Sequence, residues 1–346
     1  MTNEKKYLHF ELVRILKEET DPKHPMSQAE LTRRLGVNRS TVSRALGDLL
    51  NDSKHSHVYS VHVDQELDEE GNEINPDKRS YHGKVYYKHD FSTAELRFLM
   101  DGILFSRHVP AEQRDQIIKK LLALGDRQFR KTRSMANVRR LAVDEPMNED
   151  LFYNIDTINQ AIEEGKKIST VYAYMGPDFT FEPSRGGKTQ ILNPYAMVVR
   201  NGYYFLICNN DHYSNLTHYR IDRMTKVKIE EETVKPIRQL DGFAGGLNLQ
   251  DYMSHNINMA FGDPVRITFI AKPKAVREII DAFGKSVEFT RREDGDLDCV
   301  VRVPEYDMER WVLMWGDLVT VTGPDTLMEK LKGYAEILAE KYAGAK

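Results

Sequence analysis

Apolar residues in the first fifty positions recur at the spacing of α-helices. They follow one another three or four positions apart over Tyr7–Leu16 and again after a capping box, Ser27-Gln28-Ala29-Glu30, which predicts two helices that each bury one face. Gly36 supplies the positive φ that ends the second helix. Asn38 or Ser40 then caps a third helix. The apolar positions of this third helix are Val42, Ala45, Leu46, Leu49 and Leu50.

Residues 58–87 alternate apolar and polar side chains on both sides of a polar insert. Strict alternation predicts β-strands. Two strands directly behind the third helix are typical of the wing of a winged helix–turn–helix, here with a long tip.

Residues 91–124 return to helical spacing. Ser92 with Glu95 marks the start of one helix, and Pro110 opens a second. The apolar residues of this segment are more numerous than one packed face requires, which predicts a dimer contact or docking against a neighbouring domain. A boundary follows at residues 144–150, and residues 151–164 form one more amphipathic helix.

The stretch Ile191–Met224 predicts strand, tight turn, strand, loop and strand. Asn201-Gly202 lies between two apolar-aromatic runs and is a strong hairpin signal, because both residues tolerate a positive φ. Alternation places Tyr204 on one face of the hairpin and Tyr203 on the other. Short, strongly curved strands favour a small SH3-like β-barrel. In the third strand, alternation groups on one face His218, Arg220 and Asp222.

Residues 265–342 predict strand, helix, hairpin, helix, strand and a final helix, an order typical of a ferredoxin-like α/β sandwich. Together the patterns predict a multidomain α+β chain. Its expected parts are a winged helix–turn–helix domain at 1–90, a helical connector at 91–150, the small barrel at 151–240 and the C-terminal sandwich at 260–346.

Composition narrows the function classes. The 346 residues have a formal net charge of −4, so any DNA binding needs a local basic patch. Cys208 and Cys299 lie in apolar runs and are expected to be buried thiols in a reducing compartment. The N-terminus lacks the apolar segment of a signal peptide, and there is no run of about 18 apolar residues. A cytoplasmic protein without membrane contact is expected.

Polar positions at the start of the third helix carry the first candidate chemistry. Short hydroxyls and arginines reach phosphates and base edges when such a helix enters a major groove, so double-stranded DNA is an expected partner. The alternative is an ordinary three-helix bundle with a solvated basic face. No metal site is expected at His55, His57 and His62, which have no further ligands nearby. The candidate DNA-contact residues are Arg39, Ser40, Thr41, Ser43 and Arg44.

The predicted hairpin and third strand carry the second candidate chemistry. A guanidinium offers a fixed fork of donors that matches phosphate, and an adjacent aromatic ring offers a face for a base. An anion site is therefore predicted. The alternative is that Arg220 and Asp222 form a structural ion pair and that the aromatic residues belong to the core. The residues concerned are Arg200, Tyr204, Arg220 and Arg223.

The same stretch resembles a WYL domain, a bacterial ligand-sensing module usually attached to a winged helix–turn–helix. The family's Trp-Tyr-Leu triplet corresponds to Tyr204-Phe205-Leu206, in which only the leucine is identical. The resemblance extends to Asn193-Pro194-Tyr195, Arg200-Asn201-Gly202 and Tyr219-Arg220-Ile221-Asp222-Arg223, the last similar to the family's Phe-Arg-Leu-Asp-Arg strand. It implies a basic groove that senses a nucleotide or nucleic-acid fragment. Carried over by position, the ligand-binding residues are Arg220, Arg223, Arg200, Tyr204 and His218.

The C-terminal residues resemble the extension found behind WYL domains, at Trp311, Trp315-Gly316 and Gly323-Pro324. In that family the extension often mediates dimerisation and can cover the sensor groove of the neighbouring subunit. The resemblance implies a homodimeric, ligand-responsive transcription factor, more often a repressor, that binds an inverted-repeat operator. Family members are often associated with phage defence or DNA-damage responses.

Two other functions stay open on the sequence. One is a non-regulatory nucleic-acid adaptor whose arginines bind single strands constitutively. The other is an enzyme that acts on nucleotides. The chain has no phosphate-binding glycine loop, no metal-ligand spacing and no Ser/His/Asp or Cys/His signature. No catalytic residue and no cofactor are therefore expected.

Overall fold

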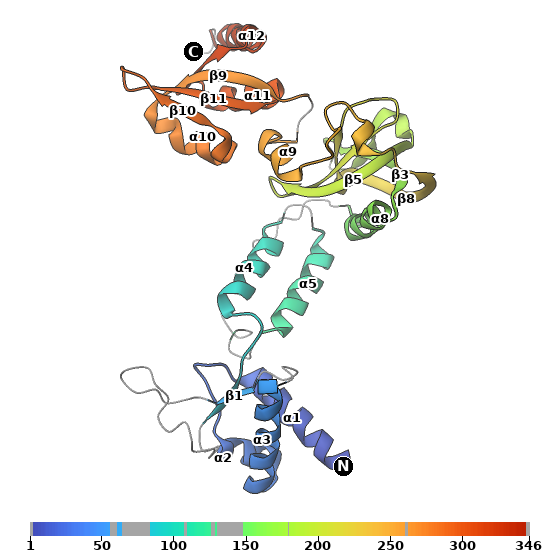
Figure 1. The fold of residues 1–346 in the computed structure, drawn as a ribbon, viewed down its shortest axis with the longest axis vertical. Coiled ribbons are helices and arrows are strands. Elements are labelled where there is room, and N and C mark those ends of the chain that lie inside the picture. The colour runs from blue at the N-terminus through green and yellow to red at the C-terminus, as the bar shows by residue number, and fades with distance from the viewer. Residues whose placement is uncertain are drawn as a thin grey trace. The chain divides into compact units, whose positions relative to one another are not determined.

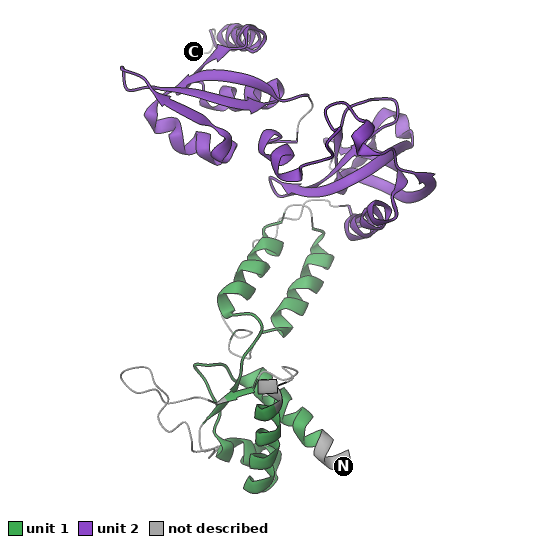
Figure 2. Ribbon diagram, viewed as in Figure 1, with its two compact units in different colours: residues 1–144 green, residues 145–346 purple. Residues whose placement is uncertain are grey.

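The computed structural model describes residues 3–55, 61–63, 84–106, 109–125, 129, 148–178, 180–259 and 262–343. The chain divides into two compact units, residues 1–144 and 145–346 (Figure 2). Helices dominate the described part of the first unit, and the second combines two sheets with helices, so this is a multidomain protein of mixed α/β structure (Figure 1). His57 and the predicted wing tip, residues 64–83, lie outside the described residues.

The first unit opens with helices α1 (Asn3–Glu19), α2 (Gln28–Leu35) and α3 (Arg39–His55). Ser27 caps α2 as predicted, because its Oγ accepts the backbone N–H of Glu30 at 3.2 Å. The Glu30 carboxylate itself accepts a bond from Arg34 at 3.0 Å. Gly36 ends α2 at a φ of 65°, in the left-handed region that the sequence predicts.

One core holds these three helices together. Leu12, Leu31 and Leu46 are fully buried, and the five apolar residues predicted on α3 all belong to the core. Tyr7 begins the predicted apolar face of α1 but is 69% exposed. Two antiparallel strands, β1 (Val61–Val63) and β2 (Val85–Tyr87), add to this core. Val85 also exchanges two backbone hydrogen bonds of 2.8 Å with Met26, which ties the strands to the start of α2.

Helices α4 (Thr93–Leu104) and α5 (Ala111–Ala123) form a pair with a small core of their own. Ser92 and Glu95 make the predicted reciprocal capping box, with bonds of 3.2 and 2.7 Å. Leu96 is buried in the pair, whereas Phe98 is 79% exposed and Phe105, just after α4, is 58% exposed. The described residues of this unit therefore leave part of the apolar surface that the sequence indicates exposed.

Two glycines of the first unit are expected to respond oppositely to alanine, although both have open space where a Cβ would lie. Gly36 has a positive φ, which costs an L-residue about 1 kcal/mol, so Gly36→Ala should lower the free energy of unfolding by that amount. Gly102 lies inside α4, where alanine is the better helix former by about 0.8–1.0 kcal/mol, so Gly102→Ala should raise it. Denaturant unfolding followed by circular dichroism measures both changes, and equal signs would contradict this account.

The second unit begins with α8 (Leu151–Glu164), which packs against a curled six-stranded sheet. Asn201 and Gly202 both have a positive φ, 51° and 80°, and form the predicted turn between β5 and β6. Strand β8 (Met224–Thr233) pairs with β3. The other strands, in order of pairing, are β4 (Phe181–Pro183), β3 (Lys166–Met175), β5 (Gln190–Arg200), β6 (Tyr203–Asn209) and β7 (Thr217–Arg220).

Residues 234–259, which follow the curled sheet, contain no strand and include the short helix α9 (Leu249–His255). Leu240 and Met259 of this segment are buried with Val198 of β5 and Ile207 of β6. The segment therefore covers one face of the β5–β6 hairpin.

The remaining residues form an antiparallel four-stranded sheet in the order β10-β11-β9-β12 with three helices. Trp311 packs in its core with ring centroids 4.9 Å from Phe283 and 6.0 Å from Phe269. No helix of the described residues has the length and apolar character needed to cross a membrane. The elements are β9 (Val265–Ala271), α10 (Val276–Phe283), β10 (Glu288–Arg291), β11 (Leu297–Val303), α11 (Glu305–Trp315), β12 (Val319–Gly323) and α12 (Asp325–Tyr342).

Candidate functional site

The start of α3 displays the polar residues predicted to contact DNA. Asn38 caps the helix: its Oδ1 accepts the Thr41 backbone N–H at 2.9 Å and the hydroxyls of Thr41 and Ser40 at 2.6 and 2.8 Å. Arg39, Ser40 and Arg44 are exposed, whereas Thr41 and Ser43 are half-buried. The two arginines are thus the long cationic side chains on this surface, while the hydroxyls of Ser40 and Thr41 serve the cap.

Gln28 links this surface to α2, a role that the sequence reasoning missed. Its side chain is buried and its Oε1 accepts from Arg39 Nε at 3.4 Å, while its Nε2 donates to the Arg39 carbonyl at 3.5 Å. The one sequence signal for the contact between Gln28 and Arg39 was that a polar residue follows the Ser27 cap directly, at a position that faces the next helix. The orientation of α3 relative to α2 is therefore fixed by polar contacts as well as by the core.

In the second unit, strand register brings together three of the five predicted ligand residues. Tyr203 pairs with Arg200, and Phe205 pairs with Arg220. Ile207 pairs with His218. Directly paired residues point to the same side of a sheet, and alternate residues of β6 share a face. Arg200, His218 and Arg220 therefore lie on one face, which we name the outer face.

Arg220 forms the ion pair that was the alternative to ligand binding. Its Nε and Nη2 donate to the two carboxylate oxygens of Asp222 at 3.1 and 2.6 Å. Its guanidinium carbon lies 3.5 Å from the centre of the Tyr203 ring. Burial acts to lower the pKa of Arg220, but the bonds to Asp222 outweigh it and the pKa is raised. The guanidinium is therefore always charged and is held between a ring and a carboxylate.

The ring beside Arg220 belongs to Tyr203. Tyr204 was the aromatic residue assigned to the site, but it alternates with Tyr203 and pairs with Val199, so it points to the opposite face. Tyr203, which the sequence placed on the face opposite Tyr204, makes the contact.

Arg223 lies beyond strand β7, so strand register does not place it on the outer face. Strand β7 ends at Arg220 and a 3-10 turn spans Ile221–Arg223, so the predicted alternation through residue 222 stops there. Within this turn, the Asp222 carboxylate bonds back to Arg220. A continued strand would also have placed Asp222 on the same side as Arg220. Burial raises the pKa of Tyr172, and the charge of Arg223 acts against that rise, so the guanidinium lies close to this phenol. Strand register therefore places Tyr204 on the opposite face, and Arg223 lies beside Tyr172.

Arg200 and His218 bond to the segment that covers the outer face. Arg200 Nε donates to the Ile257 carbonyl at 2.6 Å. The His218 ring lies 3.2 Å from the Met259 carbonyl through Nδ1 and 2.6 Å from the Tyr252 hydroxyl through Nε2. A carbonyl only accepts, so the contact with Met259 requires a proton on Nδ1. In the tautomer protonated there, Nε2 is the acceptor for the Tyr252 hydroxyl.

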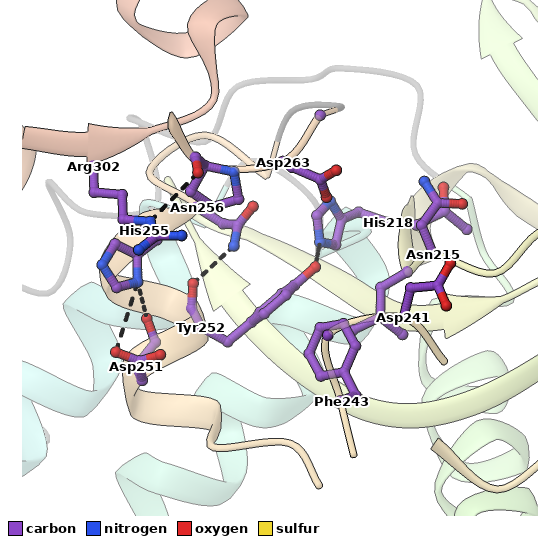
Figure 3. Close-up of a pocket in the computed structure, with 15 residues that line it drawn as sticks. Asn215, His218, Asp241, Phe243, Asp251, Tyr252, His255, Asn256, Asp263 and Arg302 are labelled. Carbon is purple, nitrogen blue, oxygen red and sulfur yellow. Dashed lines mark hydrogen bonds and ion pairs between the residues drawn. The ribbon is translucent and has the colours of Figure 1, made fainter. Parts of the chain in front are cut away.

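A pocket of about 480 Å³ opens beside His218 (Figure 3). Tyr252 and Phe243 line it with aromatic rings, which lie 6.0 Å apart between centroids. Burial raises the pKa of Tyr252, as expected for a phenol that donates inside the protein. The sequence offered no signal for these residues, because they follow the predicted barrel in a stretch without strands. Besides Tyr252, the charged and titratable residues of the lining are His218, Asp241, Asp251, His255, Asp263 and Arg302.

Two family models match the second unit. Residues 153–229 match the WYL domain, which spans the curled sheet with Arg200, His218 and Arg220. The chain is a WYL-domain protein. Residues 263–339 match the WCX domain, so the C-terminal sheet and its helices form the second of two adjoining domains. The pocket beside His218 is lined from both domains, since Asp263 and Arg302 belong to the WCX domain.

Two solved structures match this protein at low sequence identity and low TM-score. Proteasome accessory factor B/C (PafBC) of Arthrobacter aurescens is 14% identical over 99% of this chain and 49% of that chain, with a TM-score of 0.30. A CRISPR Cas-related protein is 13% identical over 100% of this chain and 94% of that chain, with a TM-score of 0.39. This WYL-domain chain therefore spans less than half of the PafBC chain. Comparison with curated proteins gave no match.

Proposed function

We propose that this WYL-domain protein is a DNA-binding transcriptional regulator. The observation that carries the proposal is the start of α3, where Arg39, Ser40 and Arg44 are exposed on a helix that follows α2 through a tight glycine turn. An exposed helix start with arginines is suited to the major groove. The helices α1 to α3 with the strands β1 and β2 act as a winged helix–turn–helix, and α3 is the recognition helix.

The WYL domain is proposed to sense an anionic ligand, a nucleotide or a nucleic-acid fragment, through the outer face. Arg220 supports this because its guanidinium is permanently charged and stacked on Tyr203, which orients its donors. A phosphate must compete with Asp222, which already occupies those donors. Binding therefore exchanges one anion for another, and the regulator responds as a repressor that releases its operator when the exchange takes place.

The regulator is proposed to act as a homodimer in the cytoplasm on an inverted-repeat operator, without catalytic activity. Exposed Phe98 and Phe105 support a dimer contact, since apolar residues clustered on one helix pair favour association. The C-terminal domain is proposed to be a ferredoxin-like sandwich that contributes to the dimer. The strand order β10-β11-β9-β12, with α10 and α11 as the connecting helices, supports that fold.

Binding of the full chain to duplex DNA from the region upstream of its own gene tests the proposal. The regulator is expected to prefer this duplex over a scrambled duplex of equal length, and its affinity should fall as salt rises because phosphate contacts release counterions. Equal affinity for both duplexes, together with tighter binding to single-stranded DNA, would instead favour a constitutive adaptor. No binding to any of the three would refute the DNA-binding role.

Substitutions at the Arg220–Asp222 pair test ligand sensing separately. Arg220→Ala is expected to weaken binding of a short fluorescent single-stranded oligonucleotide at least about tenfold, since charge-assisted hydrogen bonds contribute about 1.5–3 kcal/mol. Asp222→Asn is expected to tighten it, because the competing carboxylate loses its charge. Fluorescence anisotropy measures both, and the exposed Arg266→Ala in the WCX domain is the matched control. Equal loss in the Arg220 and Arg266 variants would show that only overall charge matters.

A further inference from the structure

Three of the four residues after α9, Asn256–Met259, are buried to an extent that is unusual for a loop, whereas Asn258 is exposed. Asn256, Ile257 and Met259 are each less than a tenth exposed. The Asn256 side chain donates back to the Tyr252 carbonyl at 2.8 Å and so stays attached to α9. We name these four residues the strap.

The WYL domain holds the strap by three side chains. Arg200 donates to the Ile257 carbonyl at 2.6 Å, and the neighbouring Asn201 donates to Asn258 Oδ1 at 3.0 Å. His218 Nδ1 lies 3.2 Å from the Met259 carbonyl. The first two bonds come from the end of the β5–β6 hairpin and the third contact from β7. Two parts of the sheet therefore bind the strap.

The WCX domain holds the same residues from the other side. Ile257 belongs to the core that contains Phe283 and Trp311. The backbone N–H of Asn258 donates to Asp307 Oδ2 of α11 at 3.3 Å. Asp307 is 1% exposed, and burial raises its pKa while Asn258 and Arg200 act to lower it. A carboxyl this buried depends on its few polar partners, so loss of the strap would leave it without an important one.

The strap is also strained where the WYL domain holds it. Met259 has a φ of 54°, a left-handed conformation that side chains other than glycine rarely adopt. It is kept there by burial beside Val198 and Ile207 and by the His218 contact. Strained backbone persists only where the surroundings over-determine it. Weakening one of these contacts therefore favours release of the strap.

His218 connects the strap to the pocket. One ring nitrogen lies 3.2 Å from the Met259 carbonyl. The other lies 2.6 Å from the hydroxyl of Tyr252, which lines the pocket (Figure 3). A group that enters the pocket and bonds to the Tyr252 hydroxyl must compete with this imidazole. The ring can then turn or change tautomer, and the bond to Met259 is lost with it.

We propose that the strap couples the pocket to the WCX domain, with His218 and Tyr252 as the residues that position it. Loss of the Tyr252–His218 bond weakens the His218 contact with the Met259 carbonyl. The strap then moves, and the bond from the Asn258 backbone N–H to Asp307 on α11 is weakened as well. Coupling of this kind is reciprocal, so a substitution at Asp307 must also change the stability of the contacts around the pocket. The proposal requires no DNA, and a chain that failed to bind DNA would still test it.

Hydrogen exchange of the full chain, followed by mass spectrometry, measures the coupling in both directions. Tyr252→Phe removes one hydroxyl and is expected to speed exchange of the strap and of α11 about threefold to tenfold, the effect of one net hydrogen bond. Asp307→Asn should likewise speed exchange in α9 and β7, which border the pocket. Tyr213→Phe, an exposed tyrosine of the same domain, is the matched control and should leave the strap unchanged.

Two results would overturn the proposal. One is a Tyr252→Phe protein in which exchange rises in α9 alone and stays at the wild-type rate in the strap and α11. The other is an Asp307→Asn protein whose effect stops at the strap. Thermal unfolding of each variant shows whether a change reflects overall loss of stability, in which case exchange would rise throughout the second unit.

Discussion

Replacing Arg39 and Arg44 together by alanine is expected to weaken binding of the full chain to its upstream duplex DNA at least about 30-fold. Each arginine that reaches a phosphate or a base edge contributes about 1–3 kcal/mol, and both side chains are exposed at the start of α3. Each contact to phosphate also contributes about 0.9 to the dependence of log affinity on log salt, so the slope should become shallower by up to about 2. Fluorescence anisotropy over a series of salt concentrations measures both quantities.

The single variants Arg39→Ala and Arg44→Ala distinguish a contact to a base edge from a contact to a phosphate. A residue that contacts a base edge should relax sequence preference when it is lost, whereas a phosphate contact should weaken all duplexes alike. Arg14→Ala is the matched control, because Arg14 lies on α1 and donates to Glu11 at 2.7 Å. It should bind within about twofold of the wild type. If Arg14→Ala lost as much affinity as the double variant, α3 would not be the recognition helix.

Phe269→Ala is expected to lower the free energy of unfolding of the second unit by about 3–5 kcal/mol. Phe269 is 1% exposed in β9 and contacts the rings of Phe283 and Trp311, so its loss leaves a cavity that these large neighbours cannot close. The first unit has separate cores and should keep its own transition. Denaturant unfolding, read by tryptophan fluorescence and by circular dichroism, distinguishes the two transitions, because both tryptophans lie in the second unit.

Phe289→Ala is the control for this prediction. It removes the same side chain from β10 of the same sheet, but Phe289 is partly exposed and its loss should cost less than about 1 kcal/mol. Equal destabilisation by the two substitutions would contradict the burial argument. So would a parallel shift of the transition of the first unit.

The elements that local chemistry specifies agree with the sequence predictions. The Ser92 and Glu95 capping box starts α4, Gly36 ends α2, and Asn201-Gly202 turns β5 into β6. Each depends on residues within four positions of one another, so a linear pattern contains the information. The face of each β6 residue also follows from alternation, which is why Tyr203 and Tyr204 are correctly placed on opposite sides.

The candidate site was predictable only in part. Arg200, Arg220 and His218 were named from the sequence, and strand register places them on one face. Register depends on how the hairpin continues into the next strand, so the ring beside Arg220 could not be chosen between two adjacent tyrosines. Tyr252 was missed because a tyrosine in a stretch without strands has no periodicity to reveal its partner, which lies 34 positions earlier in the chain.

Caps, turns and alternation act over a few neighbouring residues, so the order of amino acids was enough to predict the helices, the hairpin and the polar start of α3. The resemblance to the WYL family was visible in the same way. The tertiary structure alone decided that Asp222 occupies Arg220 and that Asn256–Met259 lies between two domains. Those contacts bring together side chains far apart in the chain, and their energy depends on burial and geometry. The neighbours that the fold brings to an arginine decide whether its donors are available to a ligand or already bonded to a carboxylate, as Arg220 is to Asp222.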